Sequence, residues 1–257
     1  YFFNSASDTE VILAAYIRWG NKCLDYFNGM YAFAIYDTQC NKVLIARDRT
    51  GVKPLYYYYG EEGFIFSSEV RPIIHSGIKS FSLNKEVIAE YAMYQTVLAP
   101  HTIIKGVKML LPGHLIELDN GKPTISQYYS FNKIDPTSEN LSYSQICSKV
   151  NELLTHSVQQ RLIADVPFGA FLSGGIDSSA VVGLMSKVSS EKVQTFNVSF
   201  DERDFSEAKY ARLIAKKFNT HHHEIKLTPN DFLKQLPEAL SATDHPSGDG
   251  PNTYIVS

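Results

Sequence analysis

The stretch FGAFLSGGIDSSAVVGLM, residues 168–185, decides the fold of the second half of the chain. An apolar run ends at Leu172, the polar turn SGGIDSS follows, and a second apolar run begins at Ala180. The first run is typical of a short buried strand and the second of a helix. A strand, a glycine turn and a helix in that order predict one βα unit of a parallel sheet.

The composition of this turn indicates a phosphate site. Glycines allow a phosphate to approach the backbone closely, and the N–H groups of the following helix favour an anion. The G-x-x-x-x-G-K-[ST] pattern is not met, because Gly175 and Ile176 stand where it has Lys and Ser or Thr. Asp177 supplies a carboxylate that can hold Mg²⁺. The other residues expected around the phosphates are Ser173, Gly174, Gly175, Ser178 and Ser179. The competing interpretation is an ordinary βα turn capped by serines.

Residues 142–257 repeat this alternation of strand and helix. A capping box at Ser142 and Gln145 predicts a helix before the turn, and apolar residues recur at helical spacing after it. Further strands are predicted at 193–200 and 221–227. Between them a helix is predicted, which Asp204 with Glu207 caps. This order predicts an α/β domain with a parallel sheet. The polar segment 131–141 is typical of a linker.

Residues 1–130 have a different character. Short β-branched and aromatic runs at 30–37, 42–48, 54–60 and 63–68 predict closely spaced strands. Asn120-Gly121 predicts the turn of a later hairpin, and apolar residues from Thr9 predict a preceding helix. The first domain is therefore expected to be α+β.

Composition excludes several classes of protein. A net charge of −3 over 257 residues predicts no general affinity for nucleic acid or for an anionic membrane, and no apolar run could span a bilayer. Three scattered cysteines, Cys23, Cys40 and Cys147, argue against disulfides and a zinc site, and suit a reducing, cytoplasmic location. Because the chain opens on YFFN and stops inside an apolar pattern, we expect an internal piece of a longer protein, truncated at both ends.

The complete S-G-G-x-D-S-S pattern resembles the pyrophosphate loop of the ATP pyrophosphatases. Those enzymes split ATP into AMP and pyrophosphate, usually while adenylating a carboxylate or carbonyl. The loop by itself leaves GMP synthetase-like, NAD synthetase-like, tRNA-modifying and asparagine synthetase-like enzymes open.

The first half selects among them. FNGMYAFAIYD, LIARDRTGVKPLYYYY and FSSEVRPI resemble the glutaminase domain of glutamine-dependent asparagine synthetases, and residues 199–225 resemble the segment after their pyrophosphate loop. The resemblance implies a class II, N-terminal-nucleophile amidotransferase domain followed by an ATP pyrophosphatase domain. It further implies asparagine formation from aspartate through β-aspartyl-AMP, with ammonia from glutamine. Small-molecule substrates, ATP with Mg²⁺, and a homodimer are compatible with it.

The resemblance also assigns site residues. Asp8 matches the aspartate that contacts the α-amino group of glutamine, although an Asp before an apolar-periodic run is also a common helix cap. Leu172 and Val198 match positions that hold adenine, and Asp177 matches a Mg²⁺ ligand. The segment HPSGDGPNTYIVS, residues 245–257, lies near where such enzymes build the acceptor pocket.

The catalytic nucleophile of the family is an N-terminal cysteine, and none of the three cysteines matches it, so it is expected to lie outside this chain. Two other functions stay open: amidation of a different carboxylate, such as a polysaccharide sugar or a β-lactam precursor, and a scaffold or ammonia-dependent form.

Three further clusters are interpreted as structural. His221–His223 are not expected to bind a metal, because alternation in a strand separates neighbouring side chains. Tyr56–Tyr59 are interpreted as a packed strand, and Arg47 with Asp48, Arg49 and Lys53 as residues that order a turn and a domain contact.

Overall fold

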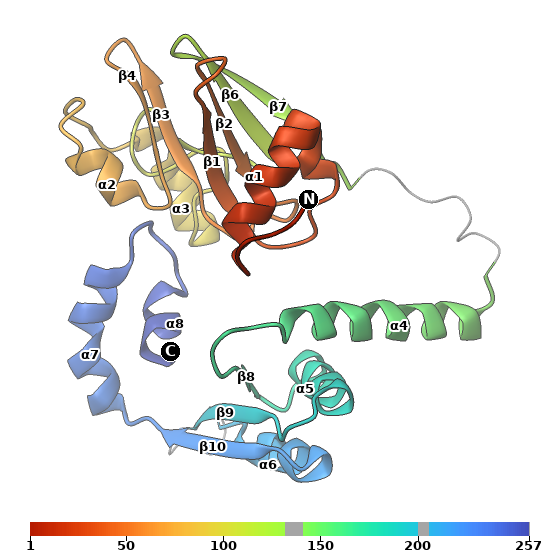
Figure 1. The fold of residues 1–257 in the computed structure, drawn as a ribbon. Helices are drawn as coiled ribbons and strands as arrows, with labels where there is room; N and C mark the ends of the chain where they lie inside the picture. Colours follow the sequence, from red (N-terminus) through yellow and green to blue (C-terminus); the bar gives the residue numbers. More distant parts are fainter. Residues whose placement is uncertain (132–140, 200–205, 257) are drawn as a thin grey trace. The chain divides into compact units, whose positions relative to one another are not determined.

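The computed structural model describes residues 1–131, 141–199 and 206–256, and contains two compact units (Figure 1). Unit 1 comprises Tyr1–Ile134 and Leu240–Asn252, and unit 2 comprises Asp135–Ala239 and Thr253–Ser257. Most of the predicted linker at 131–141 lies outside the described residues, and so does Asp204, the predicted cap. No helix among the described residues is long and apolar enough to cross a membrane.

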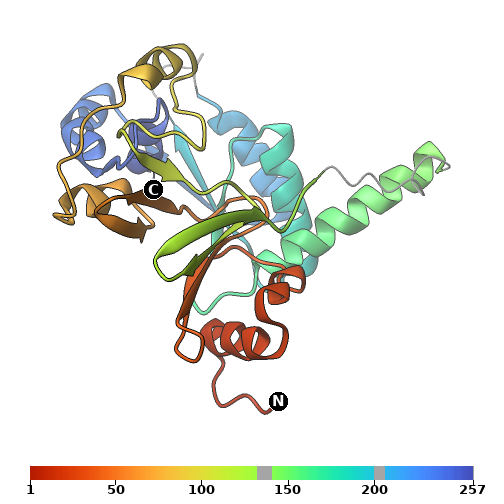
Figure 2. The same cartoon turned by 90° about the horizontal axis from the view of Figure 1, so that it is seen from above.

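Unit 1 contains two antiparallel sheets and short helices. The helices are α1 (Asp8–Trp19), η1 (Gly20–Asp25), α2 (Val70–His75), η2 (Lys85–Val87) and α3 (Ile88–Tyr94). The four-stranded sheet runs β1 (Ala32–Asp37), β2 (Lys42–Arg47), β6 (His114–Asp119) and β7 (Lys122–Gln127). The three-stranded sheet runs β4 (Gly63–Ser67), β3 (Tyr56–Gly60) and β5 (Val107–Met109). Figures 1 and 2 show the β6–β7 hairpin beside β2, as the pairing of β2 with β6 requires.

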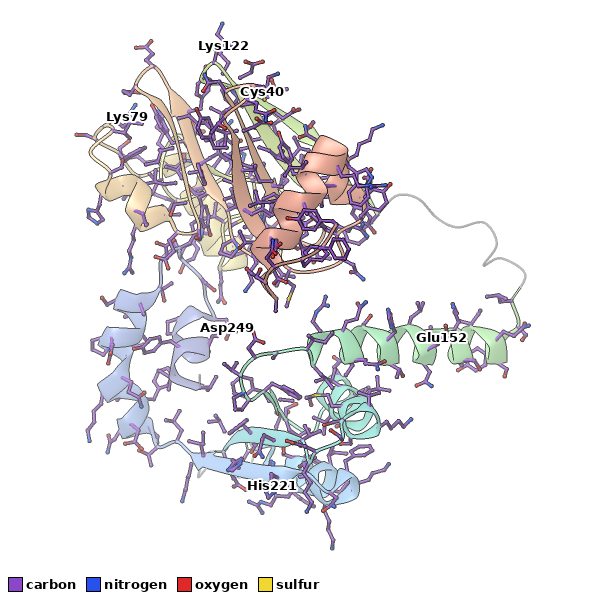
Figure 3. The ribbon with its side chains drawn as sticks, in the orientation of Figure 1. Cys40, Lys79, Lys122, Glu152, His221 and Asp249 are labelled. Atoms are coloured by element: carbon purple, nitrogen blue, oxygen red, sulfur yellow. The ribbon has the colours of Figure 1, made fainter. Side chains whose placement is uncertain are left out.

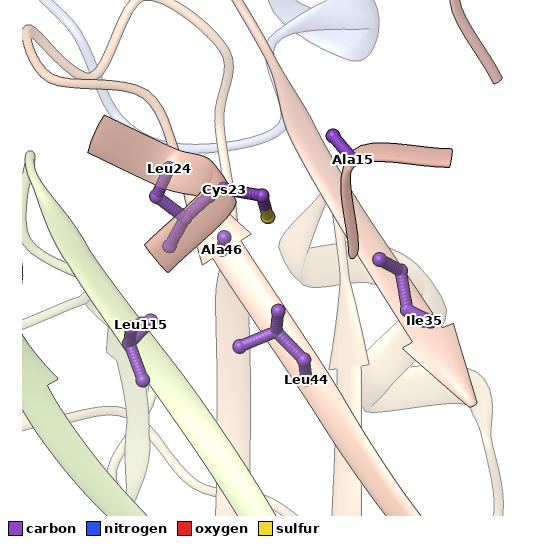
Figure 4. Packing of buried hydrophobic residues seen from close by; sticks show 7 residues of the cluster. All are labelled: Ala15, Cys23, Leu24, Ile35, Leu44, Ala46 and Leu115. Atoms are coloured by element: carbon purple, nitrogen blue, oxygen red, sulfur yellow. The ribbon is translucent and has the colours of Figure 1, made fainter. Parts of the chain in front are cut away.

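Alternation along the strands divides the core of unit 1 into layers. Leu44 and Ala46 on β2 pack with α1 and η1, in a cluster that holds Ala15 and the buried Cys23 (Figure 4). Ile45 points to the opposite face, where it packs with Tyr57 of the second sheet. The other face of the three-stranded sheet packs on α2. The buried residues between them are Tyr56, Tyr58, Val70, Ile73 and Val107. The order of layers is therefore helix, sheet, sheet, helix, and the prediction that Tyr56–Tyr59 form a packed strand is confirmed for the first three tyrosines.

Local sequence signals predict one turn and one helix of unit 1 correctly and place one helix cap wrongly. Asn120 and Gly121 both have positive φ, 51° and 77°, as the hairpin between β6 and β7 requires. The helix at Asp8 forms as expected, but its N-cap is Ser7, whose hydroxyl accepts from the backbone N–H of Thr9. The interpretation of Asp8 as a cap is therefore wrong, because the preceding serine has taken that position.

Unit 2 contains a parallel sheet. The order of its strands is β10 (His221–Lys226), β9 (Gln194–Ser199) and β8 (Gly169–Phe171), all parallel, as predicted. Its helices are α4 (Tyr143–Arg161), α5 (Ile176–Val188), α6 (Ala208–Phe218) and most of α7 (Pro229–Ala242), with the end of α8 (Gly250–Val256). Leu172 packs with Val182 of α5 and with Ala211 and Ala215 of α6 on one face of this sheet.

In unit 2 the predicted cap of α4 is present, whereas the predicted buried face of α5 is only partly right. The capping box of Ser142 and Gln145 is present at the start of α4. Apolar residues at helical spacing predict one buried face of α5, made of Ile176, Ala180, Val181, Leu184 and Val188. This prediction is wrong for Ile176, which is 89% exposed, and for Val181, which is 44% exposed. Leu184 is buried as predicted, together with Val182, Gly183 and Met185. Apolar spacing along α5 therefore does not by itself identify its buried face.

Candidate functional site

The turn between β8 and α5 has the geometry of an anion site. The backbone N–H of Leu172 donates to the carbonyl of Phe196, 2.7 Å, so the chain is still held to β9 as it leaves the strand. Gly174 then takes a φ of +85°, and Gly175 is the N-cap of α5 without a side chain that could cap it. The first N–H groups of a helix lack partners within the helix, so this end of α5 can donate to a ligand.

Hydroxyl groups line the turn and bond to one another. The Oγ atoms of Ser173 and Ser178 are 2.9 Å apart, and Ser173 Oγ also accepts from the N–H of Gly175. Ser178 Oγ lies 3.3 Å from the carbonyl of Gly175. Ser179 Oγ is buried and has no partner among the described residues. The structure therefore brings the predicted serines and glycines into one closed turn.

Gly174 is required by packing as well as by its backbone angle. A Cβ built on Gly174 would lie 2.5 Å from Tyr210 Cβ and 2.7 Å from the backbone nitrogen of Ala211, both on α6. A Cβ on Gly175 would meet nothing nearer than Ser173 Oγ, at 3.3 Å. The first glycine thus lets the turn lie directly against α6, whereas the second is open.

Asn197 is a supporting residue that the sequence prediction missed. Its side chain, 5% exposed on β9, donates from Nδ2 to the carbonyl of Leu172, 2.9 Å. This bond ties the residue before the turn to the neighbouring strand. A polar residue among the buried positions of β9 is the signal that could have identified it, since buried polar groups need a partner.

Asp177 fits the role of a cation ligand. It lies in the first turn of α5 and is exposed, and its carboxylate has no hydrogen bond or ion pair within the described part of the chain. Carboxylate oxygens supplemented by substrate phosphates are the ligands that Mg²⁺ prefers. Within the turn it is the residue whose charge is free for a ligand.

The two predicted adenine positions differ in exposure. Leu172 is 1% exposed and lies in the core against α5 and α6. Val198 is half-buried on β9, where its side chain alternates with the buried Asn197 and therefore points to the other face of the sheet. The structure does not bring these two side chains to one face.

The predicted glutamine-binding residue lies in unit 1, in the first turn of α1. Asp8 is exposed there. Its neighbour Glu10 instead accepts hydrogen bonds from the backbone of Asn4 and Ser5 and from the Ser5 hydroxyl, which lowers the pKa of Glu10. Glu10 thus folds residues 4 and 5 against the helix, and Asp8 takes no part in that arrangement.

The charged cluster after β2 orders a turn, as predicted. Arg47 donates to the carbonyls of Lys53 and Gly51, at 2.8 and 2.7 Å. Asp48 is fully buried and accepts from the backbone of residues 50, 52 and 53. Its role in a contact between domains stays a prediction.

The histidines of β10 bond to neighbouring side chains. Nδ1 of His222 lies 3.0 Å from Thr195 Oγ1, and Nε2 of His223 lies 2.8 Å from Gln194 Oε1. His221 is exposed at the start of the strand (Figure 3). In the described residues no group of three or more His, Cys, Asp or Glu is placed to hold a metal ion.

Comparison with known proteins identifies both halves. Residues 1–129 match the family model of the glutamine amidotransferase domain, and residues 149–256 match that of asparagine synthase. A putative glutamine-hydrolyzing asparagine synthetase 2 of Methanocaldococcus jannaschii is 35% identical over 98% of this chain and 50% of its own length. The glutamine-hydrolyzing asparagine synthetase 3 of Bacillus subtilis is 30% identical over 95% of this chain and 42% of its own length. The amidase chyE of Penicillium rubens is 29% identical over 96% of this chain and 38% of its own length.

These matches first define a class, an amidotransferase domain joined to a synthetase domain. The chain belongs to the family of glutamine-hydrolysing asparagine synthetases. It spans about half the length, or less, of the curated relatives that it matches.

Proposed function

We propose that the chain is part of an enzyme that makes asparagine from aspartate, with ATP as the activating substrate and glutamine as the source of ammonia. The observation that best supports this function is the closed SGGIDSS turn at the start of α5, in the same chain as an amidotransferase domain. The turn would bind the pyrophosphate part of ATP, and the amidotransferase domain would supply ammonia as the nucleophile.

On the synthetase side, the turn would hold the pyrophosphate of ATP. The N–H groups at the start of α5 and the hydroxyls of Ser173 and Ser178 would donate to the phosphates, and preorganised donors stabilise the charge that develops on a leaving group. Asp177 would hold Mg²⁺, which neutralises charge on the phosphates when bound. The aspartate side chain would attack the α-phosphorus of ATP, so that β-aspartyl-AMP forms and pyrophosphate leaves.

Adenine is proposed to lie near Leu172 and Val198. The half-buried Val198 is the one of the two that offers side-chain surface to a ring. Ammonia would then displace AMP from the activated carboxyl group and give asparagine.

On the glutaminase side, Asp8 would bind the α-amino group of glutamine. Its exposed carboxylate supports this role, because Ser7 and Glu10 already perform the capping and the folding of the preceding residues. The class II, N-terminal-nucleophile chemistry is part of the same proposal. The free cysteines suit the cytoplasm as the compartment, and the nucleophile is not assigned to any of them: Cys23 is buried, and burial raises the pKa of its thiol.

The test is pyrophosphate release by the full-length protein with ATP, Mg²⁺, glutamine and aspartate. The variant Asp177→Ala should lower aspartate-dependent release by about 100-fold or more, because it removes charge stabilisation at the leaving group. Glutamine hydrolysis should persist in the same variant. The matched control is Glu191→Gln, which removes an exposed carboxylate beyond the other end of α5 and should leave release unchanged. Release that does not depend on aspartate would refute asparagine synthesis, and unchanged release in Asp177→Ala would refute the assigned role.

A second candidate is the same chemistry on another carboxylate. The similarity to a fungal protein named as an amidase favours keeping this option. A panel of carboxylic acids in the pyrophosphate assay separates the two, because release should follow the acid that the acceptor pocket fits.

A further inference from the structure

Strand β9 carries a row of polar side chains into the core of unit 2. Thr195, Asn197 and Ser199 are 0%, 5% and 4% exposed, and they alternate with half-buried residues, so all three point to the same face of the sheet. A strand inside a parallel sheet is normally buried and apolar. Three buried polar residues on one face of such a strand therefore need an explanation through their partners.

Two members of this row bond toward β10. Thr195 Oγ1 lies 2.8 Å from Thr220 Oγ1, just before β10, and 3.0 Å from Nδ1 of His222 on that strand. The hydroxyl of Ser199 hydrogen-bonds to the carboxylate of Glu224, also on β10. These two residues thus tie β9 to its neighbour on one side.

Asn197, between them, bonds in the opposite direction, toward the phosphate turn. Its Nδ2 donates to the carbonyl of Leu172, 2.9 Å, and the backbone N–H of Leu172 donates to the carbonyl of Phe196, 2.7 Å. Leu172 lies between Phe171, the last residue of β8, and Ser173, the first residue of the turn. Both main-chain groups of Leu172 are therefore held by β9, and one of them is held by a side chain.

The carbonyl of Leu172 is part of the peptide group that opens the turn. A peptide group is planar and trans, so the direction of the Leu172 carbonyl also fixes the direction of the Ser173 N–H. That N–H is the first backbone donor of the turn. Further along, Gly174 lies directly against Tyr210 of α6. The turn is thus fixed by α6 at Gly174 and by Asn197 where it begins.

The other end of the Asn197 amide shows that this bond determines its orientation. Oδ1 is buried and has no partner among the described residues. If the amide were turned over, Oδ1 would face the carbonyl oxygen of Leu172, and two acceptors would repel each other. An unpaired buried acceptor costs free energy of folding, and such groups occur at functional sites, where stability is not the only requirement.

We propose that Asn197 is a positioning residue for ATP. It holds the peptide group between Leu172 and Ser173 in the orientation that binds the pyrophosphate part of the nucleotide. A peptide group without this bond must be ordered each time ATP binds, and that ordering lowers the affinity. The inference rests on the proposed function, because it takes ATP as the ligand of the turn.

The first test removes the donor. Asn197→Leu keeps a side chain of similar size and should raise the dissociation constant of ATP by about tenfold or more, because the Leu172 carbonyl loses its partner in the core. The constant is measured by calorimetry on the full-length protein with Mg²⁺. At saturating ATP the rate of pyrophosphate release should stay within about threefold of the wild type, since the lost interaction is made before and during the reaction alike. An unchanged dissociation constant would overturn the proposal, and so would a loss confined to the saturated rate.

The second test makes the donor depend on pH. In Asn197→Asp a neutral carboxyl group can donate to the Leu172 carbonyl, whereas a carboxylate can only accept and would repel it. Burial raises the pKa of a carboxyl group, from about 4 to about 7–9 when burial is complete. The titratable groups on the same face of the neighbouring elements are His222 and Glu224 of β10 and Arg212 of α6, which pairs with Glu224.

The expected result is a ratio that changes with pH. Relative to the wild type at the same pH, the dissociation constant of ATP for Asn197→Asp should be within about twofold at pH 5 and should rise about tenfold or more by pH 9. Comparison at equal pH removes the titration of ATP and of His222, which both proteins share. A ratio that does not change with pH would contradict the role of the Nδ2 donor.

Thr195→Val is the matched control. It removes a buried polar group from the same face of the same strand, but its partners are Thr220 and His222 rather than the turn. We expect a lower free energy of unfolding in urea and a dissociation constant of ATP within about twofold of the wild type. A loss of affinity as large as in Asn197→Leu would mean that any weakening of β9 suffices, and the positioning role would be wrong.

The outcomes for Asn197 and for the proposed function can be told apart. Should Asn197→Leu fail to fold, the pH series of Asn197→Asp decides, since its neutral form keeps the bond. ATP binding is measured without aspartate or glutamine. A wild-type protein that binds ATP but makes no asparagine would therefore refute the proposed function, while the dissociation constants would still decide the role of Asn197. A wild-type protein that binds no ATP would refute both.

Discussion

Replacing Gly174 with alanine tests whether the phosphate turn is shaped by contact with α6. A non-glycine residue at a φ of +85° costs about 1–2 kcal/mol. The added Cβ would also lie 2.5 Å from Tyr210 Cβ, and overpacking of this kind costs about 1–3 kcal/mol. We expect Gly174→Ala to lower the free energy of unfolding by about 2–5 kcal/mol, and to weaken ATP binding because the turn must move away from α6.

The neighbouring glycine provides the control. Gly175 has a φ of −66°, which alanine adopts freely, and its Cβ would lie 3.3 Å from the nearest atom, Ser173 Oγ. A loss of up to about 1 kcal/mol at the cap is opposed by about 0.4–1 kcal/mol from a less flexible unfolded chain, so Gly175→Ala should be nearly neutral. Urea unfolding of both variants, followed by far-ultraviolet circular dichroism, measures the difference. If Gly175→Ala were as damaging as Gly174→Ala, contact with α6 would not be what shapes the turn.

Three further results are expected. Burial opposes ionisation of Asp48, but its hydrogen bonds outweigh burial and hold the pKa of Asp48 below the usual 3.8. The stabilisation that Asp48 contributes should therefore be complete above pH 3.8 and be lost as the pH falls through the folded pKa. Denaturant titrations at several pH values, followed by the fluorescence of the single tryptophan, should show this loss in the wild-type protein and not in Asp48→Ala. The hydroxyl of Tyr58, together with Lys79, lowers the pKa of Glu62 to about 2, so a titration of the Glu62 carboxyl followed by NMR should show it charged at pH 3, and an ordinary midpoint near 4.5 would contradict the contact. Because Cys23 is buried and the other two cysteines are exposed, a thiol reagent should modify two thiols in the folded chain and three in urea; three in the folded chain would refute the packing in unit 1.

Features that depend on neighbouring residues could be predicted from the sequence. The Asn120-Gly121 turn needs positive φ values that these residues tolerate, and the capping box of Ser142 is complete within four residues. The βα turn at Ser173 has a local part, since its glycines and serines bond to one another. Its close approach to α6 at Gly174 is a tertiary contact that the local pattern does not contain.

Features that depend on partners far away in the sequence could not be predicted from it. Ile176 fits the apolar spacing of α5, yet it is exposed, because burial depends on which part of the helix packs on Leu172 and α6, and that part is the one around Val182. Asn197 was missed because its partner, the carbonyl of Leu172, follows another strand, β8, 25 residues earlier in the sequence.

The cap of α2 has no local signal at all. The carboxylate of Asp244 accepts from the backbone N–H groups of Val70, at 2.6 Å, and Arg71, at 2.9 Å. Beside it, the ring of His245 stacks on Tyr56. The helix start and the carboxylate that caps it lie in different halves of the chain, so no local pattern contains this bond.

The cap on α2 also sets an order of events during protein synthesis. Val70 and Asp244 are 174 residues apart, and at about 5–20 residues per second the ribosome needs about 10–35 s to make the chain between them. For that interval the start of α2 and the ring of Tyr56 emerge without the partners that cover them in the finished protein. The amino-terminal unit, although translated first, is completed only after the parallel sheet of the second unit has left the ribosome.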